Sequence, residues 1–416
     1  MNRFLSIATI DEASKRINGV VKDTPLQRAK RLSQFFDAKI YFKREDLQDV
    51  RSYKIRGAYN LMSSLTQEEK KKGVVCASAG NHAQGVAFSA SSLNIHTTIF
   101  MPKTTPLQKI NRVKHFGGKW VDVQLVGLNY DESCHAAKEY CKEKGAIFVH
   151  PFDDYIVISG QGTVGKEIFD KLGKNIDYVL CPIGGGGLIS GVATYLKSKI
   201  KNIKIIGVEP TGAAGMEVSR KAGKVVSLDT VDTFVDGVAV KTVGEKTFKI
   251  VSFLVNDIII VPEGKVCTTM IDLYQNEGIV AEPAGALAIS ALDSVAKEIK
   301  GKTVVCILSG GNNDILRYPE VMEKNLVYQG LKHYFLIEFA QKPGQLRQFV
   351  DKALGPTDDI VRFEYIKKSA KETGPALIGI ELTKKEDFKP LCQRMEKLGI
   401  GYKLITSSDL LYRYLI

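Results

Sequence analysis

The chain has 416 residues, of which 44% are hydrophobic and 25% charged, and its formal net charge is +12. These proportions are typical of a folded protein of two or three domains, and they exclude a disordered or fibrous chain. No apolar run approaches the ~20 residues of a membrane span, and the N-terminal stretch becomes polar too early for a signal peptide. We therefore expect a cytoplasmic protein with no membrane partner.

The positive charge is spread along the chain instead of forming a basic stripe with interleaved aromatic residues, which argues against a nucleic-acid partner. The seven cysteines stand apart without a C-x-x-C pair, and the six histidines offer no ligand cluster. Neither a disulfide framework nor a metal site is expected.

Short apolar strands alternate with longer helical patterns from about residue 39 to residue 309. This alternation predicts parallel sheets covered by helices, and the number of strands favours two α/β lobes with a cleft between them. The helical stretches include residues 106–118 and 129–145, the second ending at Gly145, a typical C-terminal residue. The expected strands span residues 39–43, 73–78, 96–102, 119–125, 146–151, 177–183, 204–210, 257–262 and 303–311.

The pattern changes after Tyr318, where a connecting helix and turn precede a strand–helix–strand–strand–helix–strand order, the ferredoxin-like plan. We expect a catalytic region at residues 1–322, a connector at 323–330 and a separate α+β domain at 331–416. The six elements of that domain are expected at residues 332–340, 342–354, 360–368, 374–383, 386–399 and 402–406.

A buried strand, four consecutive glycines at 184–187 and a helix follow one another in YVLCPIGGGGLISG. Glycines let the backbone approach a ligand, and a helix start supplies free N–H groups for an anion, so this segment predicts a phosphate site. The Rossmann pattern G-x-G-x-x-G fails in every register. Glu209 nevertheless stands where a ribose-binding acid would, which keeps a nicotinamide-dependent oxidoreductase as an alternative.

Two further loops follow strands in the same way. In the segment 76–90, Ser78, Gly80 and Asn81 leave N–H groups able to hold a carboxylate, and the segment 306–314 ends a strand in a serine and two glycines. Because ligands bind beyond the carboxyl ends of parallel strands, these loops and the segment that carries Lys54 are expected to converge. An amine beside a phosphate site and a hydroxyl-bearing loop suits pyridoxal phosphate, whose aldehyde forms a Schiff base with lysine.

Five motifs in the chain carry a resemblance to a known family. They are S-x-K-x-R-G at 52–57, S-A-G-N-H-A-Q-G at 78–85, G-G-G-G-L at 184–188, A-E-P-A-G-A at 281–286 and S-G-G-N at 309–312. The chain resembles the two-lobed, tryptophan synthase β-like enzymes of fold type II that use pyridoxal 5'-phosphate. With its C-terminal module, it is similar from about residue 5 to its end to the biosynthetic threonine dehydratases.

The resemblance implies a role for each matching residue. Lys54 would hold the cofactor and act as the proton-shuttling base, Asn81 would hydrogen-bond the 3-hydroxyl group, and Ser309 would meet the pyridine nitrogen. A hydroxyl partner does not keep that nitrogen protonated, which favours loss of a β-substituent over transamination. The phosphate would lie on Gly184, Gly185, Gly186, Gly187 and Leu188, and the substrate on Ser78, Ala79, Gly80, Asn81 and His82.

Two positions depart from serine racemase, a relative. Ala79 replaces a serine that acts there as a second base, so we expect poor racemisation. Gly215 replaces an acid that binds a divalent metal there together with the equivalent of Glu209, so no metal is expected. For His82 a structural role is at least as plausible as a functional one.

Residues 331–416 resemble a single copy of the ACT-like domain of the shorter biosynthetic threonine dehydratases. The resemblance implies inhibition by isoleucine, with valine as its antagonist, in a homo-oligomer that we expect to be a tetramer. The effector's carboxylate would bind at the loop and helix start of residues 341–349. A purely structural oligomerisation domain is the alternative.

The activity implied by the resemblance is deamination of L-threonine to 2-oxobutanoate and ammonia, the first step of isoleucine biosynthesis, with serine as a weaker substrate. A serine dehydratase or a β-replacing synthase of the same fold is the nearest alternative. A non-catalytic amino-acid sensor built around residues 331–416 is a third hypothesis, beside the nicotinamide-dependent oxidoreductase.

Overall fold

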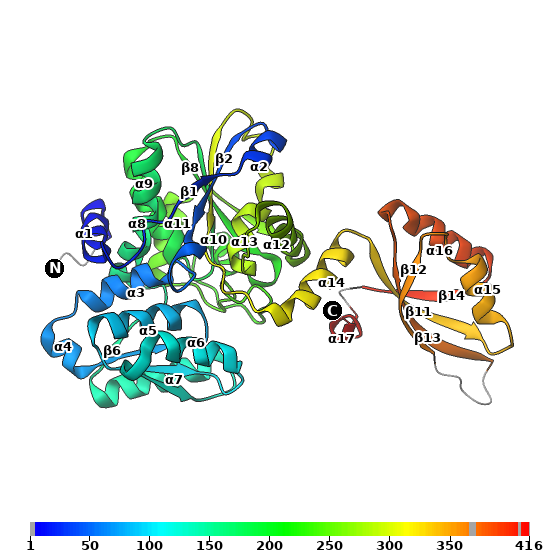
Figure 1. Cartoon of the computed structure of the whole chain (residues 1–416), viewed down its shortest axis with the longest axis horizontal. Coiled ribbons are helices and arrows are strands. Elements are labelled where there is room, and N and C mark those ends of the chain that lie inside the picture. Colours follow the sequence, from blue (N-terminus) through cyan, green and yellow to red (C-terminus); the bar gives the residue numbers. More distant parts are fainter. Residues whose placement is uncertain (1–4, 366–371, 407–408, 416) are drawn as a thin grey trace. The chain divides into compact units, whose positions relative to one another are not determined.

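The computed structural model of the chain describes residues 5–365, 372–406 and 409–415 (Figure 1). The chain divides into two compact units, residues 1–313 and residues 314–416. None of the helices within the described ranges combines the length and the apolar character needed to cross a membrane.

The first unit contains a six-stranded sheet with the strand order β1-β2-β10-β7-β8-β9. All neighbouring pairs are parallel except β1 with β2. Strand β1 was not expected from the sequence, since it has only three residues and pairs antiparallel at the edge. The strands are β1 (Leu26–Arg28), β2 (Lys39–Arg44), β7 (Tyr178–Pro182), β8 (Lys204–Pro210), β9 (Asp257–Val261) and β10 (Thr303–Leu308).

A second, four-stranded sheet of the same unit has the order β5-β4-β3-β6, and all its neighbouring pairs are parallel. The expectation of two parallel sheets is therefore confirmed, apart from the antiparallel edge strand β1. We call the six-stranded sheet with its helices the large lobe. The four-stranded sheet with the helices α5 (Asn81–Leu93), α6 (Leu107–Gly117) and α7 (Tyr130–Lys144) is the small lobe. The strands are β3 (Val74–Ala77), β4 (Thr97–Met101), β5 (Val121–Leu125) and β6 (Ile147–Phe148).

Helices cover both sheets, and each lobe has its own apolar core. The helix expected at residues 129–145 is α7, which ends at Gly145 in the left-handed conformation, as predicted. The helices of this unit are α1 (Ile7–Ile17), α2 (Lys30–Phe35), α3 (Lys54–Ser63), α4 (Gln67–Lys72), α5 (Asn81–Leu93), α6 (Leu107–Gly117), α7 (Tyr130–Lys144), α8 (Tyr155–Leu172), α9 (Gly187–Lys199), α10 (Gly215–Ala222), α11 (Glu245–Leu254), α12 (Glu263–Glu277) and α13 (Pro283–Ser290).

Close contacts between helices place the loops of the site. A Cβ atom on Gly191 of α9 would lie 2.5 Å from the backbone nitrogen of Gly162 of α8, so these helices approach each other nearly backbone to backbone. A Cβ atom on Gly160 of α8 would lie 2.5 Å from the carbonyl oxygen of Arg56 of α3. Helix α8 therefore fixes both the helix after the four glycines and the helix that begins with Lys54.

The second unit begins with α14 and continues with the β-α-β-β-α-β order of the ferredoxin-like plan, as predicted. Its antiparallel sheet has the order β12-β13-β11-β14. The apolar residues of one sheet face, such as Phe335 and Ile378, form a core with Phe349 of α15 and Leu391 of α16. The elements are α14 (Tyr318–Tyr328), β11 (Lys332–Ala340), α15 (Gln345–Lys352), β12 (Asp359–Tyr365), β13 (Thr373–Glu381), α16 (Phe388–Lys397), β14 (Gly401–Ile405) and α17 (Tyr412–Leu415).

Candidate active site

Lys54 is the first residue of α3, and the segment before it is tied to the carboxyl end of β10. The backbone N–H of Tyr53 donates to the carbonyl oxygen of Ser309 (3.2 Å). Ser52 forms an isolated antiparallel bridge with Gly310. Two motifs that are more than 250 positions apart in the chain therefore lie side by side, where the parallel-sheet rule places a ligand.

The amine of Lys54 lies in surroundings that weaken its hold on a proton. Its Nζ donates to the carbonyl oxygen of Pro151 (3.4 Å) and lies 5.3 Å from the centroid of the Tyr53 ring. Burial lowers the pKa of Lys54 to about 8, while the nearby carboxyl group of Glu282 opposes that shift. With such a pKa, a larger fraction of the amine is neutral and nucleophilic near pH 7 than in an ordinary lysine.

The loop between β7 and α9 has no room for side chains. A Cβ atom on Gly184 would lie 2.9 Å from the Cα atom of Val238, and one on Gly185 would lie 2.2 Å from the ring of Phe152. Gly186 has a φ of 90°, a left-handed conformation that other residues disfavour. Packing alone thus requires glycine at these positions, which the sequence pattern had attributed to a ligand.

The backbone of the same loop still fits an anion. None of the N–H groups from Gly184 to Leu188 has a hydrogen-bond acceptor among the residues that the structure describes. On the carbonyl side, the oxygen of Gly185 accepts from the hydroxyl group of Thr247 (2.6 Å), which fixes the loop. Unbonded N–H groups at the start of α9, a helix of 13 residues, suit the oxygens and charge of a phosphate group.

Unsatisfied buried polar atoms gather around Lys54. Within the described ranges, six buried side-chain atoms have no hydrogen-bond partner, and four of them belong to three of the quoted motifs. Buried polar groups are nearly always paired in folded proteins, so this concentration indicates that a ligand with polar groups belongs there. A pyridoxal phosphate molecule fits this description. The four atoms are Ser52 Oγ, His82 Nδ1, Gln84 Oε1 and Asn312 Oδ1.

The loop after β3 holds the residues expected at the substrate. The Ser78 hydroxyl group accepts from the backbone N–H of Gly80 (3.2 Å), and Asn81 starts α5. His82 is buried with Nε2 2.9 Å from the carbonyl oxygen of Val149, so Nε2 carries the proton and Nδ1 is a bare acceptor. Burial and the nearby charge of Lys54 lower the pKa of His82 to about 3, which keeps the ring neutral.

Ser309, expected at the pyridine nitrogen, is buried directly after β10. Its hydroxyl group donates to the carbonyl oxygen of Ala284 (3.1 Å), at the start of α13. A hydroxyl proton rotates freely about the Cβ–Oγ bond, so the same group can donate to an unprotonated pyridine nitrogen in place of Ala284.

Two residues of the quoted motifs, the buried Glu282 and the half-buried Asn312, had no predicted role. Glu282 accepts from Asn81 Nδ2 at Oε1 (2.6 Å) and from the backbone N–H of Asn312 at Oε2 (3.2 Å). Asn312 Nδ2 donates to Asn81 Oδ1 (2.7 Å) and to the carbonyl oxygen of Val50 (2.7 Å). Both residues stand in motifs, but a glutamate before proline reads as a helix start, and nothing in the sequence pattern shows that it is buried.

Arg56, two residues after Lys54, was also given no role. Its guanidinium group is fully buried and donates to Glu45, to Glu167 of α8 and to Thr163. The side chain of Lys43, likewise buried, pairs with Glu167. This arrangement, which we call the Arg56 cluster (Lys43, Glu45, Arg56 and Glu167), anchors α3 to the large lobe.

Glu209, considered for a ribose or a metal, has another use. Its two carboxyl oxygens accept from the backbone N–H groups of Met216 (2.8 Å) and Glu217 (2.9 Å), so the side chain caps α10. Burial raises its pKa to about 7. Among the described residues, no group of three or more histidine, cysteine, aspartate or glutamate side chains is arranged to hold a metal ion.

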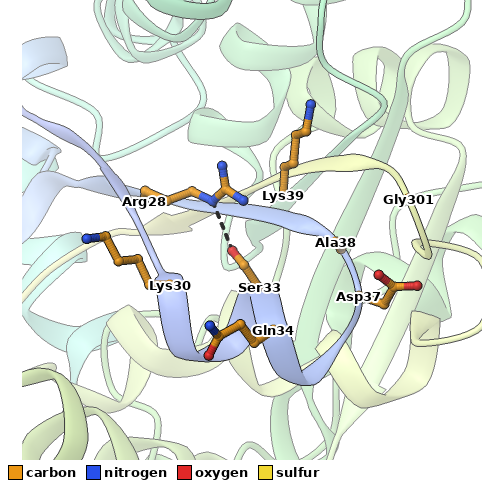
Figure 2. Close-up of a pocket in the computed structure, with 8 residues that line it drawn as sticks. All are labelled: Arg28, Lys30, Ser33, Gln34, Asp37, Ala38, Lys39 and Gly301. Atoms are coloured by element: carbon orange, nitrogen blue, oxygen red, sulfur yellow. Dashed lines mark hydrogen bonds between the residues drawn. The ribbon is translucent and has the colours of Figure 1, made fainter.

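A surface pocket lies at the opposite end of the large sheet (Figure 2). Its residues include Lys39, the first residue of β2, and Gly301, just before β10, so it lies at the amino ends of these strands. Figure 2 shows Arg28 turned onto Ser33, to which its Nε donates (3.1 Å). None of the five motifs contributes to this pocket, and we assign the chemistry to the Lys54 site.

Comparison with known proteins agrees with this geometry. The family described as "Pyridoxal-phosphate dependent enzyme" matches residues 17–310, and the "C-terminal regulatory domain of Threonine dehydratase" matches residues 323–415. The biosynthetic L-threonine dehydratase IlvA of Halalkalibacterium halodurans is 53% identical over 412 residues, with 99% of each chain covered. That of Bacillus subtilis is 51% identical, with 100% of this chain and 98% of the relative covered.

Solved structures show the same relationship over most of the chain. The processed form of threonine deaminase isoform 2 from Solanum lycopersicum has a TM-score of 0.72 and 42% identity, covering 78% of this chain and 95% of that one. Maize serine racemase has a TM-score of 0.72 and 33% identity, covering 78% and 98%. These matches favour pyridoxal phosphate over the nicotinamide alternative. The chain belongs to the pyridoxal-phosphate dependent enzyme family and, within it, to the biosynthetic L-threonine dehydratases.

Proposed function

We propose that this protein deaminates L-threonine to 2-oxobutanoate and ammonia with pyridoxal phosphate, as the first step of isoleucine biosynthesis. The observation that carries the proposal is the lowered pKa of Lys54 at a site with unbonded backbone N–H groups and unpaired buried polar atoms. Full-length similarity to biosynthetic L-threonine dehydratases supports the same substrate. Within this proposal serine is a weaker substrate.

Different residues of the site bind different parts of the cofactor. The N–H groups from Gly184 to Leu188 bind its phosphate, Lys54 holds its aldehyde carbon, and Asn81 and Ser309 orient its ring by hydrogen bonds. When bound, pyridoxal phosphate supplies the electron sink that makes the α-proton of an amino acid removable.

Lys54 also moves the proton. Once the amino group of threonine had replaced Lys54 at the aldehyde carbon, the freed, neutral Nζ would accept the α-proton, and the pKa of about 8 keeps that amine close to balance between its two protonation states near neutral pH. Loss of the β-hydroxyl group as water follows, and the released enamine adds water to give 2-oxobutanoate and ammonia. The lowered pKa of His82, about 3, makes its ring too weak a base to take the α-proton, which leaves Lys54 as the base of the site.

The loop of residues 78–82 is proposed to hold the substrate carboxylate through its backbone N–H groups and the Ser78 hydroxyl group. Ala79 has no proton to give or take, so a base on the face opposite Lys54 is missing at this position. Elimination is therefore favoured over racemisation, and this separates the proposal from the activity that names the maize relative, a serine racemase.

We further propose that residues 331–416 bind an amino-acid effector, isoleucine as inhibitor and valine as antagonist, in a tetramer located in the cytoplasm. Support comes from the match of residues 323–415 to a regulatory domain of threonine dehydratase. The loop of residues 341–344 leads into α15 through Gly344, which has a φ of 87°, and this turn is where we place the effector's carboxylate.

The test starts from the full-length protein with its cofactor. Borohydride reduction followed by peptide mapping is expected to place the pyridoxyl label on Lys54. An assay of 2-oxobutanoate release from threonine, with and without isoleucine, then tests activity and regulation in one experiment. A protein that binds the cofactor at Lys54 but releases no oxo acid from threonine contradicts the substrate assignment and leaves the cofactor assignment intact.

A further inference from the structure

The amide group of Asn81 is bonded at both of its ends by residues of the other lobe. Asn81 belongs to α5 of the small lobe, while Glu282 precedes α13 and Asn312 follows β10 in the large lobe. Asn81 Nδ2 donates to Glu282 Oε1 (2.6 Å), and Asn81 Oδ1 accepts from Asn312 Nδ2 (2.7 Å). These two bonds therefore connect the lobes at the site itself.

The two bonds leave the Asn81 amide a single orientation. A carboxylate accepts only, so the Nδ2 side of Asn81 must face Glu282. Asn312 cannot turn over either, because its Nδ2 also donates to the carbonyl oxygen of Val50 (2.7 Å), another group that only accepts. Nδ2 carries two protons, and within the described part of the chain Glu282 takes one of them. The second N–H of Asn81 is thus a donor of fixed direction.

Two glycines, Gly285 and Gly310, leave room for the Glu282 carboxyl group. A Cβ atom on Gly310 would lie 2.3 Å from Glu282 Oε1, so a side chain at position 310 would displace it. A Cβ atom on Gly285 would lie 2.0 Å from the carbonyl oxygen of Gly310. The glycines of A-E-P-A-G-A and S-G-G-N therefore allow these two motifs to pack so that Glu282 reaches Asn81.

We propose that Glu282 and Asn312 are positioning residues that hold Asn81 with one N–H available to the 3-oxygen of the cofactor, and that the ionised carboxylate of Glu282 is the form that holds it. This inference rests on the proposed function, because it takes Asn81 as a partner of bound pyridoxal phosphate. A hydrogen bond to a charged acceptor is stronger than one to its neutral form, so protonation of Glu282 loosens Asn81.

Glu282 is buried among groups of both signs. Burial and the negative charge of Asp236 raise its pKa to about 7, against the bonds from Asn81 and Asn312 and the positive charge of Lys109. It also acts electrostatically on Lys54, on Arg112 and on Tyr53. The carboxyl group is therefore mostly protonated at pH 6 and mostly ionised at pH 8, and a glutamine at this position imitates the protonated state.

The test compares affinities for pyridoxal phosphate in the full-length chain freed of cofactor. The dissociation constant is measured by absorbance titration at pH 6 and at pH 8 for the wild type and for Glu282→Gln. The ratio of the variant's constant to the wild-type constant is expected to be near one at pH 6 and about 10 at pH 8, which is the loss of one hydrogen bond to a charged group. Asn312→Ala is expected to weaken binding at both pH values, since an amide does not titrate.

Glu209→Gln is the matched control, because Glu209 is equally buried, has a pKa raised to about the same value and caps α10 without touching Asn81. Its ratio is expected to stay near one at both pH values. A Glu282→Gln ratio that does not change between pH 6 and pH 8, in a variant that melts like the wild type, overturns the inference. A wild-type chain that takes up no pyridoxal phosphate, or takes it up away from Lys54, overturns the proposed function instead.

Discussion

Helix α3 carries two buried polar sites, two residues apart, that differ in how completely their groups are paired. Arg56 is fully buried, and its guanidinium group donates to two carboxylates, a hydroxyl group and the carbonyl oxygen of Lys22. Around Lys54, by contrast, Ser52 Oγ, His82 Nδ1 and Asn312 Oδ1 are buried without partners within the described ranges. The polar groups of the Arg56 site are paired within the protein, whereas several polar groups around Lys54 find partners only when a ligand is bound.

Buried charge in the Arg56 cluster serves to fix the position of helix α3. The Arg56 cluster has two cations and two carboxylates (Lys43, Arg56, Glu45 and Glu167), so its formal charges cancel inside the protein. Such clusters contribute little net stability but penalise any packing in which a member loses its partner. The pairing holds helix α3 in one place. The unpaired atoms near Lys54, its first residue, remain able to hydrogen-bond a ligand.

The largest expected effect comes from removing the amine of Lys54. Lys54→Ala is expected to lower the rate of oxo-acid release from threonine by at least ~10²–10⁴-fold, the range that a positioned general base contributes. Steady-state kinetics at saturating pyridoxal phosphate measure the effect, and Lys72→Ala, an exposed lysine at the end of α4, is the control. Activity within threefold of the wild type would mean that Lys54 is not the base.

The substitution Arg56→Met disrupts the Arg56 cluster, because it removes the guanidinium group that pairs with Glu45 and Glu167. We expect a loss of ~3–5 kcal/mol in the free energy of unfolding, because the buried carboxylate of Glu45 loses its guanidinium partner and Glu167 keeps only Lys43. Urea denaturation of the full-length chain measures it. Lys142→Met breaks the exposed pair between Lys142 and Glu139 and should change stability by less than ~1 kcal/mol. Equal effects of the two substitutions would show that the Arg56 cluster has no special weight.

A third prediction separates packing from ligand binding in the glycine loop. Gly185→Ala places a methyl group 2.2 Å from the ring of Phe152, an overpacking that costs ~1–3 kcal/mol. Because the loop must shift, the affinity for pyridoxal phosphate is expected to fall by about 10-fold or more. The double variant Gly185→Ala with Phe152→Ala restores the space. If it does not recover part of the affinity, contact with Phe152 is not the reason that position 185 requires glycine.

The smallest expected effect concerns pH and stability. The pKa of Glu209 is raised by burial from 4.5 to about 7 in the folded chain. Folding therefore takes up a proton between these values, and the contribution of Glu209 is full below pH 4.5 and lost as the pH rises through about 7. The stability difference between the wild type and Glu209→Gln should favour the wild type more at pH 5 than at pH 8. A difference that does not vary between thermal melts at these pH values contradicts the assignment.

Much of the fold could be predicted from the sequence because its signals are local. Apolar runs such as those of β7 and β10, together with a helix-ending Gly145, mark the strands and helices and imply parallel sheets. The ferredoxin-like order of the second unit was equally readable. The short antiparallel strand β1 was not, because three residues carry no periodicity and the pairing with β2 is made in space.

At the site, the sequence determined which residues have the right chemistry: a lysine before a helix, glycines before another helix, and polar loops after strands. Tertiary structure alone decided which of them are buried together, since burial and pairing depend on neighbours far along the chain. Glu282 shows the distinction. In the sequence it is an ordinary glutamate at the start of a helix. Only the close packing at Gly285 and Gly310 buries its carboxyl group and brings it to Asn81. Desolvation and distance, which set its pKa and its partners, are properties of the folded chain.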